Sequence, residues 1–254
     1  MLGPLLPYRP PAPPRQANDA MASTSPATAL IPFIIQREGE EAAPDNLIIA
    51  RTAPGGSRLH YRDEDLRDRD ARGVLYARVG RNEPNEQGMP TGKPLWKFMH
   101  PHRQMMTMQA LRCQVCAHPA KTRAGFIFLA GPHDEDPNQA EILTNQPPVC
   151  ARHVRIVASL CPHMEKRPMV FLARSAPLYG VSGVLYGRLT SGDLHVVARP
   201  DHAVPYGHPD LATFLASQMI RRLSSFRILD LDELMRGLGP GAQTPPSRPD
   251  PALP

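Results

Sequence analysis

Short apolar runs, each closed by turn-forming residues, recur along the middle of the chain. Their content of Val, Ile, Leu, Phe and Tyr, bounded by Gly, Pro, Asp and Asn, is typical of β-strands. The pattern predicts strands at residues 30–35, 46–51, 73–80, 125–130, 169–174, 181–190 and 194–199. Ser191, Gly192 and Asp193 separate the last two runs. Because glycine tolerates positive φ, this spacer favours a tight turn and an antiparallel hairpin.

Two stretches near the C-terminus follow the period of a helix instead. The first begins at Pro209, which suits a first helical turn, and its apolar residues fall on one helical face: Leu211, Phe214, Leu215, Met219, Ile220 and Leu223. The second covers residues 230–238, where Asp230 caps the start and Glu233 follows three residues later. A Met-rich segment at residues 105–108 indicates another packed helix. The sequence therefore predicts an α+β fold of short antiparallel strands with C-terminal helices.

Three of the four cysteines, with one histidine, have the spacing of a metal site. Cys113 and Cys116 form a C-x-x-C pair, and Cys150 and His153 form a C-x-x-H pair further along the chain. Thiolate and imidazole groups in this pattern are the usual ligands of tetrahedral zinc. Since Pro147 and Pro148 precede the second pair, residues 149–160 are predicted to form a helix with both ligands in its first turn. A knuckle, a hairpin and then such a helix make up a treble clef.

Other interpretations of these cysteines stay open. The C-x-x-C pair is also compatible with a redox pair, and all the thiols with unliganded core residues. A disulfide framework is disfavoured, because nothing in the sequence marks the chain as secreted. If the helix continues to Cys161, that thiol lies about 16 Å along the axis from Cys150 and is excluded from the same ion. Cys161 and His163 are therefore expected to be a buried thiol and a helix-end histidine.

The same segment, about residues 112–160, resembles the zinc-bound HNH endonucleases. The resemblance rests on the C-x-x-C knuckle, on a central-histidine candidate at His133, on Asn145 shortly before the second ligand pair, and on that pair itself. It implies a treble clef, and it makes His133 and Asn145 the catalytic candidates of a metal-dependent nuclease. The family usually places an acidic residue before its central histidine and a further metal-binding histidine beside the second pair. Here Pro132 and Val154 occupy those positions.

Charge gives a separate indication of the partner. Between residues 93 and 123 there are six basic residues and no acidic one, and residues 93–174 carry a net charge of +6. Such a concentration attracts phosphates, so nucleic acid, DNA or RNA, is the expected partner. The candidate contact residues are Lys97, Arg103, Arg112, Lys121 and Arg123. A solvated basic face on an ordinary domain is the alternative interpretation.

Proline is concentrated at the two ends, with six residues in 1–14 and six in 239–254. The sequence predicts the following organisation: disordered tails at 1–28 and 239–254, an N-terminal β-rich part at 29–92, the zinc module at 93–165, and a C-terminal hairpin with helices at 166–238. Met21 is a second candidate for the start codon. No apolar run is long enough for a membrane helix and the N-terminus does not read as a secretion signal, so a cytoplasmic location is expected.

These observations lead to one functional hypothesis and two alternatives. The chain is expected to be an intracellular, zinc-stabilised binding or regulatory protein that contacts nucleic acid and is not an enzyme. The first alternative is a divergent HNH-type nuclease that uses His133. The second is a zinc-stabilised domain that binds another protein.

Overall fold

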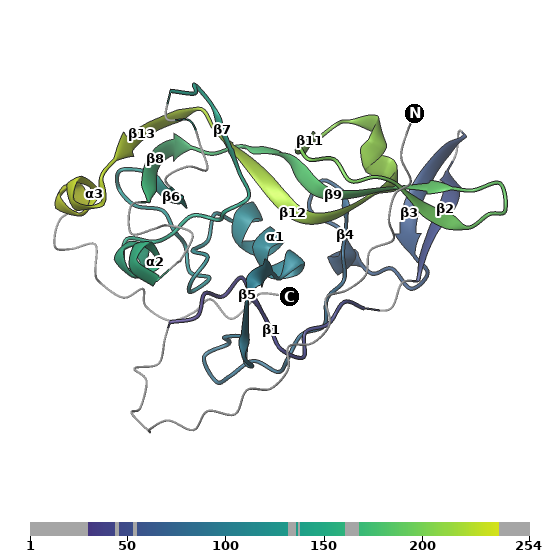
Figure 1. Cartoon of the computed structure of the whole chain (residues 1–254), viewed down its shortest axis with the longest axis horizontal. Helices are drawn as coiled ribbons and strands as arrows, with labels where there is room; N and C mark the ends of the chain where they lie inside the picture. The colour runs from purple at the N-terminus through teal and green to yellow at the C-terminus, as the bar shows by residue number, and fades with distance from the viewer. Residues whose placement is uncertain are drawn as a thin grey trace, which may run out of the picture.

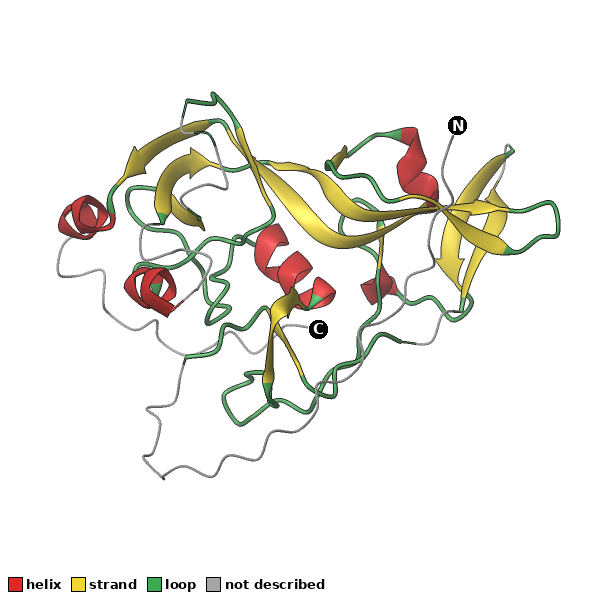
Figure 2. Ribbon diagram, viewed as in Figure 1, coloured by secondary structure: helices red, strands yellow, loops and turns green. Residues whose placement is uncertain are grey.

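The computed structural model describes residues 30–43, 46–52, 55–131, 136, 138–160 and 168–238. Both proline-rich ends lie outside the described residues, as do His133, Cys161 and His163. Within the described part the chain is a mixed α+β protein in which strands outnumber helices (Figures 1 and 2). None of its helices there combines the length and the apolar character that a membrane crossing requires.

A six-stranded sheet runs through the molecule and is built on two long strands. β9 (Leu178–Arg188) and β12 (Phe214–Leu223) pair antiparallel and extend across the view in Figure 1. Four shorter strands complete the sheet: β4 (Leu75–Tyr76) and β7 (Ile142–Thr144) pair with β12, and β10 (Leu194–Ala198) and β11 (Val204–Pro205) pair with β9. This sheet combines strands from all three segments into which the sequence divides between its tails.

The prediction of a helix from Pro209 to Leu223 is wrong. A single 3-10 turn, η3 (Pro209–Thr213), leads directly into β12. The pairing of β12 with β9 shifts register at two places, between Ala216 and Gln218 and between Ile220 and Arg221. The extra residue of the first shift is Ser217 on β12 and that of the second is Tyr179 on β9, so the alternation along β12 is displaced once. Apolar residues also lie on both faces of β12, with Phe214 in one core and Leu215 packed against another. Together these two features imitate the spacing of a helical face.

A three-stranded sheet carries the core beside the cysteines. Its order is β13 (Ser225–Leu229), β8 (Met169–Ser175) and β6 (Phe126–Ala130), all antiparallel. Side chains alternate between its faces, so Val170 and Leu172 of β8 pack into the core that holds Cys113, while Phe171 belongs to the core on the other face.

Three α-helices in the described part of the chain cover the sheets. α1 (Pro101–Gln109) is the expected Met-rich helix, and the Gln104 amide fixes it to β12 by donating to the Met219 carbonyl and accepting from the Met219 N–H, both at 2.9 Å. α2 (Val154–Leu160) follows the second ligand pair. α3 (Leu231–Leu238) agrees with the second predicted C-terminal helix, and the Asp230 carboxylate accepts from the Glu233 N–H at 2.6 Å as expected for its cap.

The remaining strands form two small two-stranded sheets. β1 (Ile35–Arg37) pairs with β5 (Pro94–Met99), and β2 (Leu47–Thr52) pairs with β3 (Gly56–Tyr61) near the short turn η1 (Leu66–Asp68). The predicted strand at 30–35 thus lies later than expected. The strand expected at 73–80 shortens to the two residues of β4. The turn between β9 and β10 is confirmed, with Gly192 at φ +95°.

Candidate metal centre

Four side chains from two distant segments meet at one point. The ligand atoms of Cys113, Cys116, Cys150 and His153 all lie within 4.8 Å of one another. His153 Nδ1 is 3.3 Å from the sulfur of Cys150 and 3.8 Å from that of Cys113. Bond lengths of about 2.3 Å to sulfur and 2.0 Å to nitrogen place the corners of a tetrahedral site roughly 3.5–3.8 Å apart. The group therefore has the composition and spacing of a metal centre.

The first ligand pair lies on a tight turn. The Ala117 N–H donates to the Cys113 carbonyl at 2.9 Å, and the Cys113 N–H donates to the His118 carbonyl at 2.7 Å. The Val115 N–H points at the Cys113 sulfur, 3.4 Å away, so a backbone dipole supports negative charge on that sulfur. Cys113 is fully buried and Cys116 half-buried.

The second pair lies just before α2 rather than inside it. The N–H groups of His153 and Val154 donate to the Cys150 carbonyl, at 2.9 and 3.2 Å, and this turn directs both ligands inward. The helix expected at 149–160 starts only at Val154, because the turn precedes the first helical residue. The hairpin expected between the ligand pairs also does not form within the described residues: β6 pairs with β8, and β7 pairs with β12.

Gln114, which sequence reasoning passed over, fastens the two segments together. Its backbone N–H donates to the Pro148 carbonyl and its side-chain amide to the Pro147 carbonyl, both at 2.9 Å. On the other side, the N–H groups of Phe33 and Ile34 donate to the Val115 and Gln114 carbonyls. Only the position of Gln114 between the two cysteines could have pointed to this role, since its partners lie more than 30 residues away.

The close approach of the ligands changes how they hold protons. Hydrogen bonds with Cys116 and Cys150 raise the pKa of Cys113, and hydrogen bonds from Cys113 and Cys116 hold the pKa of Cys150 well below its ordinary value. Hydrogen bonding to Cys116 and Cys150 raises the pKa of His153 to about 9. The cysteines are free thiols, with no disulfide among the described residues. A metal ion at this centre would displace the protons of Cys113 and His153, because it binds the thiolate and neutral imidazole forms.

Asn145, the asparagine of the HNH resemblance, has structural contacts in this fold. Its side-chain amide donates to Gln218 Oε1 at 2.8 Å, and its backbone carbonyl accepts from the Gln104 amide at 2.7 Å. These bonds tie the loop before the second ligand pair to β12 and α1. The other catalytic candidate, His133, is not among the described residues, so the two cannot be placed together.

The five basic candidates have different surroundings. Lys97, Lys121 and Arg123 are exposed, and Arg112 is half-buried with one guanidinium nitrogen donating to the Ala117 carbonyl at 3.0 Å. The prediction that Arg103 contacts nucleic acid is wrong. Arg103 is 5% exposed and donates to both carboxylate oxygens of Glu40, at 2.6 and 2.7 Å. Since its guanidinium is used inside the protein, Arg103 is removed from the expected nucleic-acid contacts.

Comparisons with protein-family models, with curated proteins and with solved structures find no match to this chain.

Replacing Ala117 with glycine is expected to stabilise the protein. Ala117 has φ +57° at the end of the first ligand turn, a left-handed conformation that costs an alanine about 1–2 kcal/mol. Glycine removes that strain but adds freedom to the unfolded chain, which leaves a net gain of up to ~1 kcal/mol. Urea unfolding of Ala117→Gly measures the gain, and metal content should not change. A less stable variant would show that the left-handed turn is not strained.

Proposed function

We propose that the protein is a zinc-stabilised, non-enzymatic binding protein for nucleic acid. Zinc is the proposed metal because three thiolates and one imidazole at tetrahedral spacing suit it better than they suit hard cations, which prefer oxygen ligands. The metal's role is structural. All four corners are supplied by side chains, so no position remains for a substrate.

One observation carries the nucleic-acid part of the proposal. Lys97, Lys121 and Arg123 are exposed, and among the described residues no carboxylate forms an ion pair with any of them. Lys121 and Arg123 follow Cys116 by five and seven residues, so the metal centre anchors the segment that presents them. Fixed, unpaired cations of this kind favour binding to phosphates.

The proposal gives Asn145 a structural role rather than a catalytic one. Its side-chain amide and its backbone carbonyl are bonded to Gln218 and Gln104, which fixes this half-buried residue to β12 and α1. We therefore treat the HNH resemblance as a similarity of ligand spacing.

Binding to labelled DNA and RNA oligonucleotides, measured by fluorescence anisotropy over a salt series, tests the function. The triple variant Lys97→Gln, Lys121→Gln and Arg123→Gln is expected to bind at least tenfold more weakly. Because each lost phosphate contact removes about 0.9 from the slope of log K against log salt on duplex DNA and about 0.7 on single strands, the slope should fall by roughly 2–3.

The matched control removes the same charge elsewhere. Arg51, Arg62 and Arg199 are exposed cations outside residues 93–174, and their triple glutamine variant should bind within twofold of the wild type. Absence of binding at low salt, or equal losses in both triple variants, would contradict the proposal. A zinc-stabilised protein-interaction domain would then be the leading hypothesis.

A further inference from the structure

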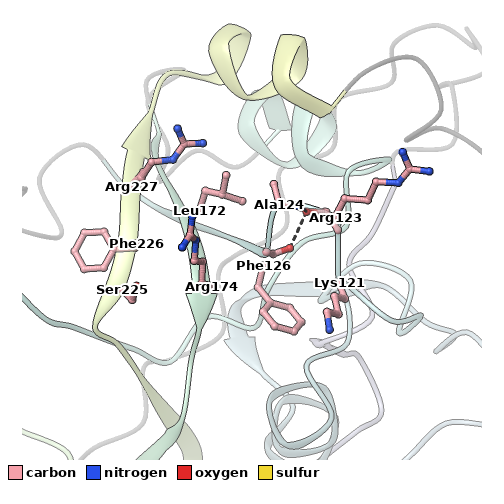
Figure 3. Close-up of a pocket in the computed structure, with 11 residues that line it drawn as sticks. Lys121, Arg123, Ala124, Phe126, Leu172, Arg174, Ser225, Phe226 and Arg227 are labelled. Atoms are coloured by element: carbon pink, nitrogen blue, oxygen red, sulfur yellow. Dashed lines mark hydrogen bonds between the residues drawn. The ribbon is translucent and has the colours of Figure 1, made fainter.

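A basic pocket of about 620 Å³ lies where the turn at residues 121–125 meets the ends of β8 and β13 (Figure 3). We call it the basic pocket; its lining includes Lys121 and Arg123 from the turn, Arg174 from β8 and Arg227 from β13. In Figure 3 the two strand arginines lie on one side and the two turn residues on the other. The volume falls in the range of ~300–1,000 Å³ that is typical of small-ligand sites.

The strand register explains how the two arginines come together. Arg227 of β13 pairs directly with Leu172 of β8. The register then shifts, because Phe226 pairs with Ala173 and Ser225 with Ser175, so Arg174 is the extra residue of a β-bulge. Arg174 and Arg227 both line the pocket beside this bulge. Leu172 also belongs to the core around Cys113, and the basic pocket therefore continues the surface of the metal module.

Gly125 sets the position of the turn against β8. It has φ +133°, and a Cβ atom there would lie 2.4 Å from the Ala173 carbonyl oxygen. Only glycine allows the backbone to come so close. The turn is also closed internally, because the Thr122 N–H and hydroxyl both donate to the Gly125 carbonyl, at 2.9 and 2.7 Å. Lys121 and Arg123 are thus presented from a rigid turn.

Among the described residues, no acidic group balances the charge of the basic pocket. Its lining contains no Asp or Glu, and none of the four cations forms an ion pair with another described residue. Neighbouring like charges on a sheet face repel one another, and an anion held among them removes that repulsion. A phosphate group suits the site best, since its oxygens accept from several guanidinium groups at once.

We propose that the basic pocket binds a phosphate group of a single-stranded nucleic acid, an inference that rests on the proposed function. The apolar part of the lining favours a single strand as the ligand. Phe126 is half-buried and lines the pocket beside the cations, where it provides apolar surface for a sugar or an unstacked base, while Leu172, 5% exposed, closes the pocket toward the core. A flexible strand brings a phosphate and its nucleoside into a recess, whereas a duplex holds its bases stacked inside.

The test compares the wild type with Arg174→Gln and Arg227→Gln combined. Anisotropy is measured with a 20-nucleotide single strand and with the matching duplex, and calorimetry with thymidine monophosphate. The double variant is expected to bind the single strand at least tenfold more weakly, with a salt slope reduced by about 1.4 for two lost contacts. Binding to the monophosphate should be lost. The control pair Arg51→Gln and Arg62→Gln, which carries the same charge change, should stay within twofold of the wild type.

Each outcome separates this inference from the proposed function. If the double variant binds the single strand as the control does, the basic pocket is not the contact, although nucleic-acid binding itself would stand. If the wild type prefers the duplex, the single-strand assignment is wrong. If only the monophosphate binds, and the double variant loses it, the pocket holds a free nucleotide and the proposed function fails. No binding to any of the three probes overturns both.

Discussion

Replacing Cys113 with serine is expected to release the metal and to unfold the module around it. Structural zinc in small domains contributes about 10–16 kcal/mol of binding free energy, as much as the whole stability of a typical domain. Cys113 is fully buried in the core formed with Val115, Val149 and Val154, so its loss removes both a ligand and the anchor of that core. Atomic emission of the purified protein should give one zinc per wild-type chain and none for the variant. The variant should also lose its cooperative thermal transition or melt far below the wild type.

Two further variants make this result specific. Cys150→Ser should behave like Cys113→Ser, because both sulfurs are corners of the same site. Cys161→Ser is the control of identical chemistry, and its zinc content should equal that of the wild type. Wild-type protein that is free of metal and still melts cooperatively would contradict the zinc assignment. Sensitivity of such a protein to a mild oxidant would then favour the redox-pair interpretation.

The metal ligands could be predicted from the sequence because their geometry is local. A two-residue spacer leaves one tight turn to deliver Cys113 and Cys116 to a common point, and the same is true of Cys150 and His153. The two pairs could be assigned to one metal ion because three thiolates and one imidazole make up a complete tetrahedral ligand set. What the sequence could not supply were the bonds that hold the pairs together, since Gln114 reaches carbonyls more than 30 residues away.

The strands were predictable where each run is short and closed by turns, as with β8 and β10. β12 was not, because the extra residue Ser217 and the apolar residues on both of its faces give a strand the spacing of a helix. Pairing partners were also out of reach. Nothing in the residues around Leu75 shows that β4 joins the sheet beside Leu215, 140 positions later.

The sequence also does not show which basic residues are free to bind a partner. A count of charges placed Arg103 with the nucleic-acid contacts, but its partner is Glu40, a residue outside the basic segment. Arg174 and Arg227 escaped notice because they meet only through the pairing of β8 with β13. Sequence gives the number of cations, and the fold decides which of them remain available.

The pair of Glu40 and Arg103 is buried in a region of excess positive charge. Glu40 is 1% exposed, and it accepts from both guanidinium nitrogens of Arg103 and from the backbone N–H of Arg37. The Arg37 side chain is buried nearby, 2% exposed. Burial alone would raise the pKa of Glu40, but the hydrogen bonds from Arg103 and Arg37 outweigh it and hold the pKa below its usual value. The carboxylate is therefore charged in the folded protein.

Replacing Glu40 with alanine is expected to lower the free energy of unfolding by about 3–5 kcal/mol, because it leaves Arg103 charged and buried without its carboxylate partner. The effect should depend on pH. Since the folded pKa of Glu40 lies below its unfolded pKa, the carboxylate stabilises the fold fully above the unfolded pKa and loses that contribution as pH falls through the folded one. Urea unfolding at pH 7 and at pH 3.5 should therefore show a smaller difference between wild type and variant at the lower pH. Protonation of the metal ligands affects both proteins, so the difference isolates Glu40.

Glu141→Ala, which breaks an exposed pair with Arg222 at 3.8 Å, is the control and should cost less than about 1 kcal/mol. A loss at Glu40 no larger than that at Glu141, or one that does not change with pH, would show that the buried pair does not hold β1 and α1 together.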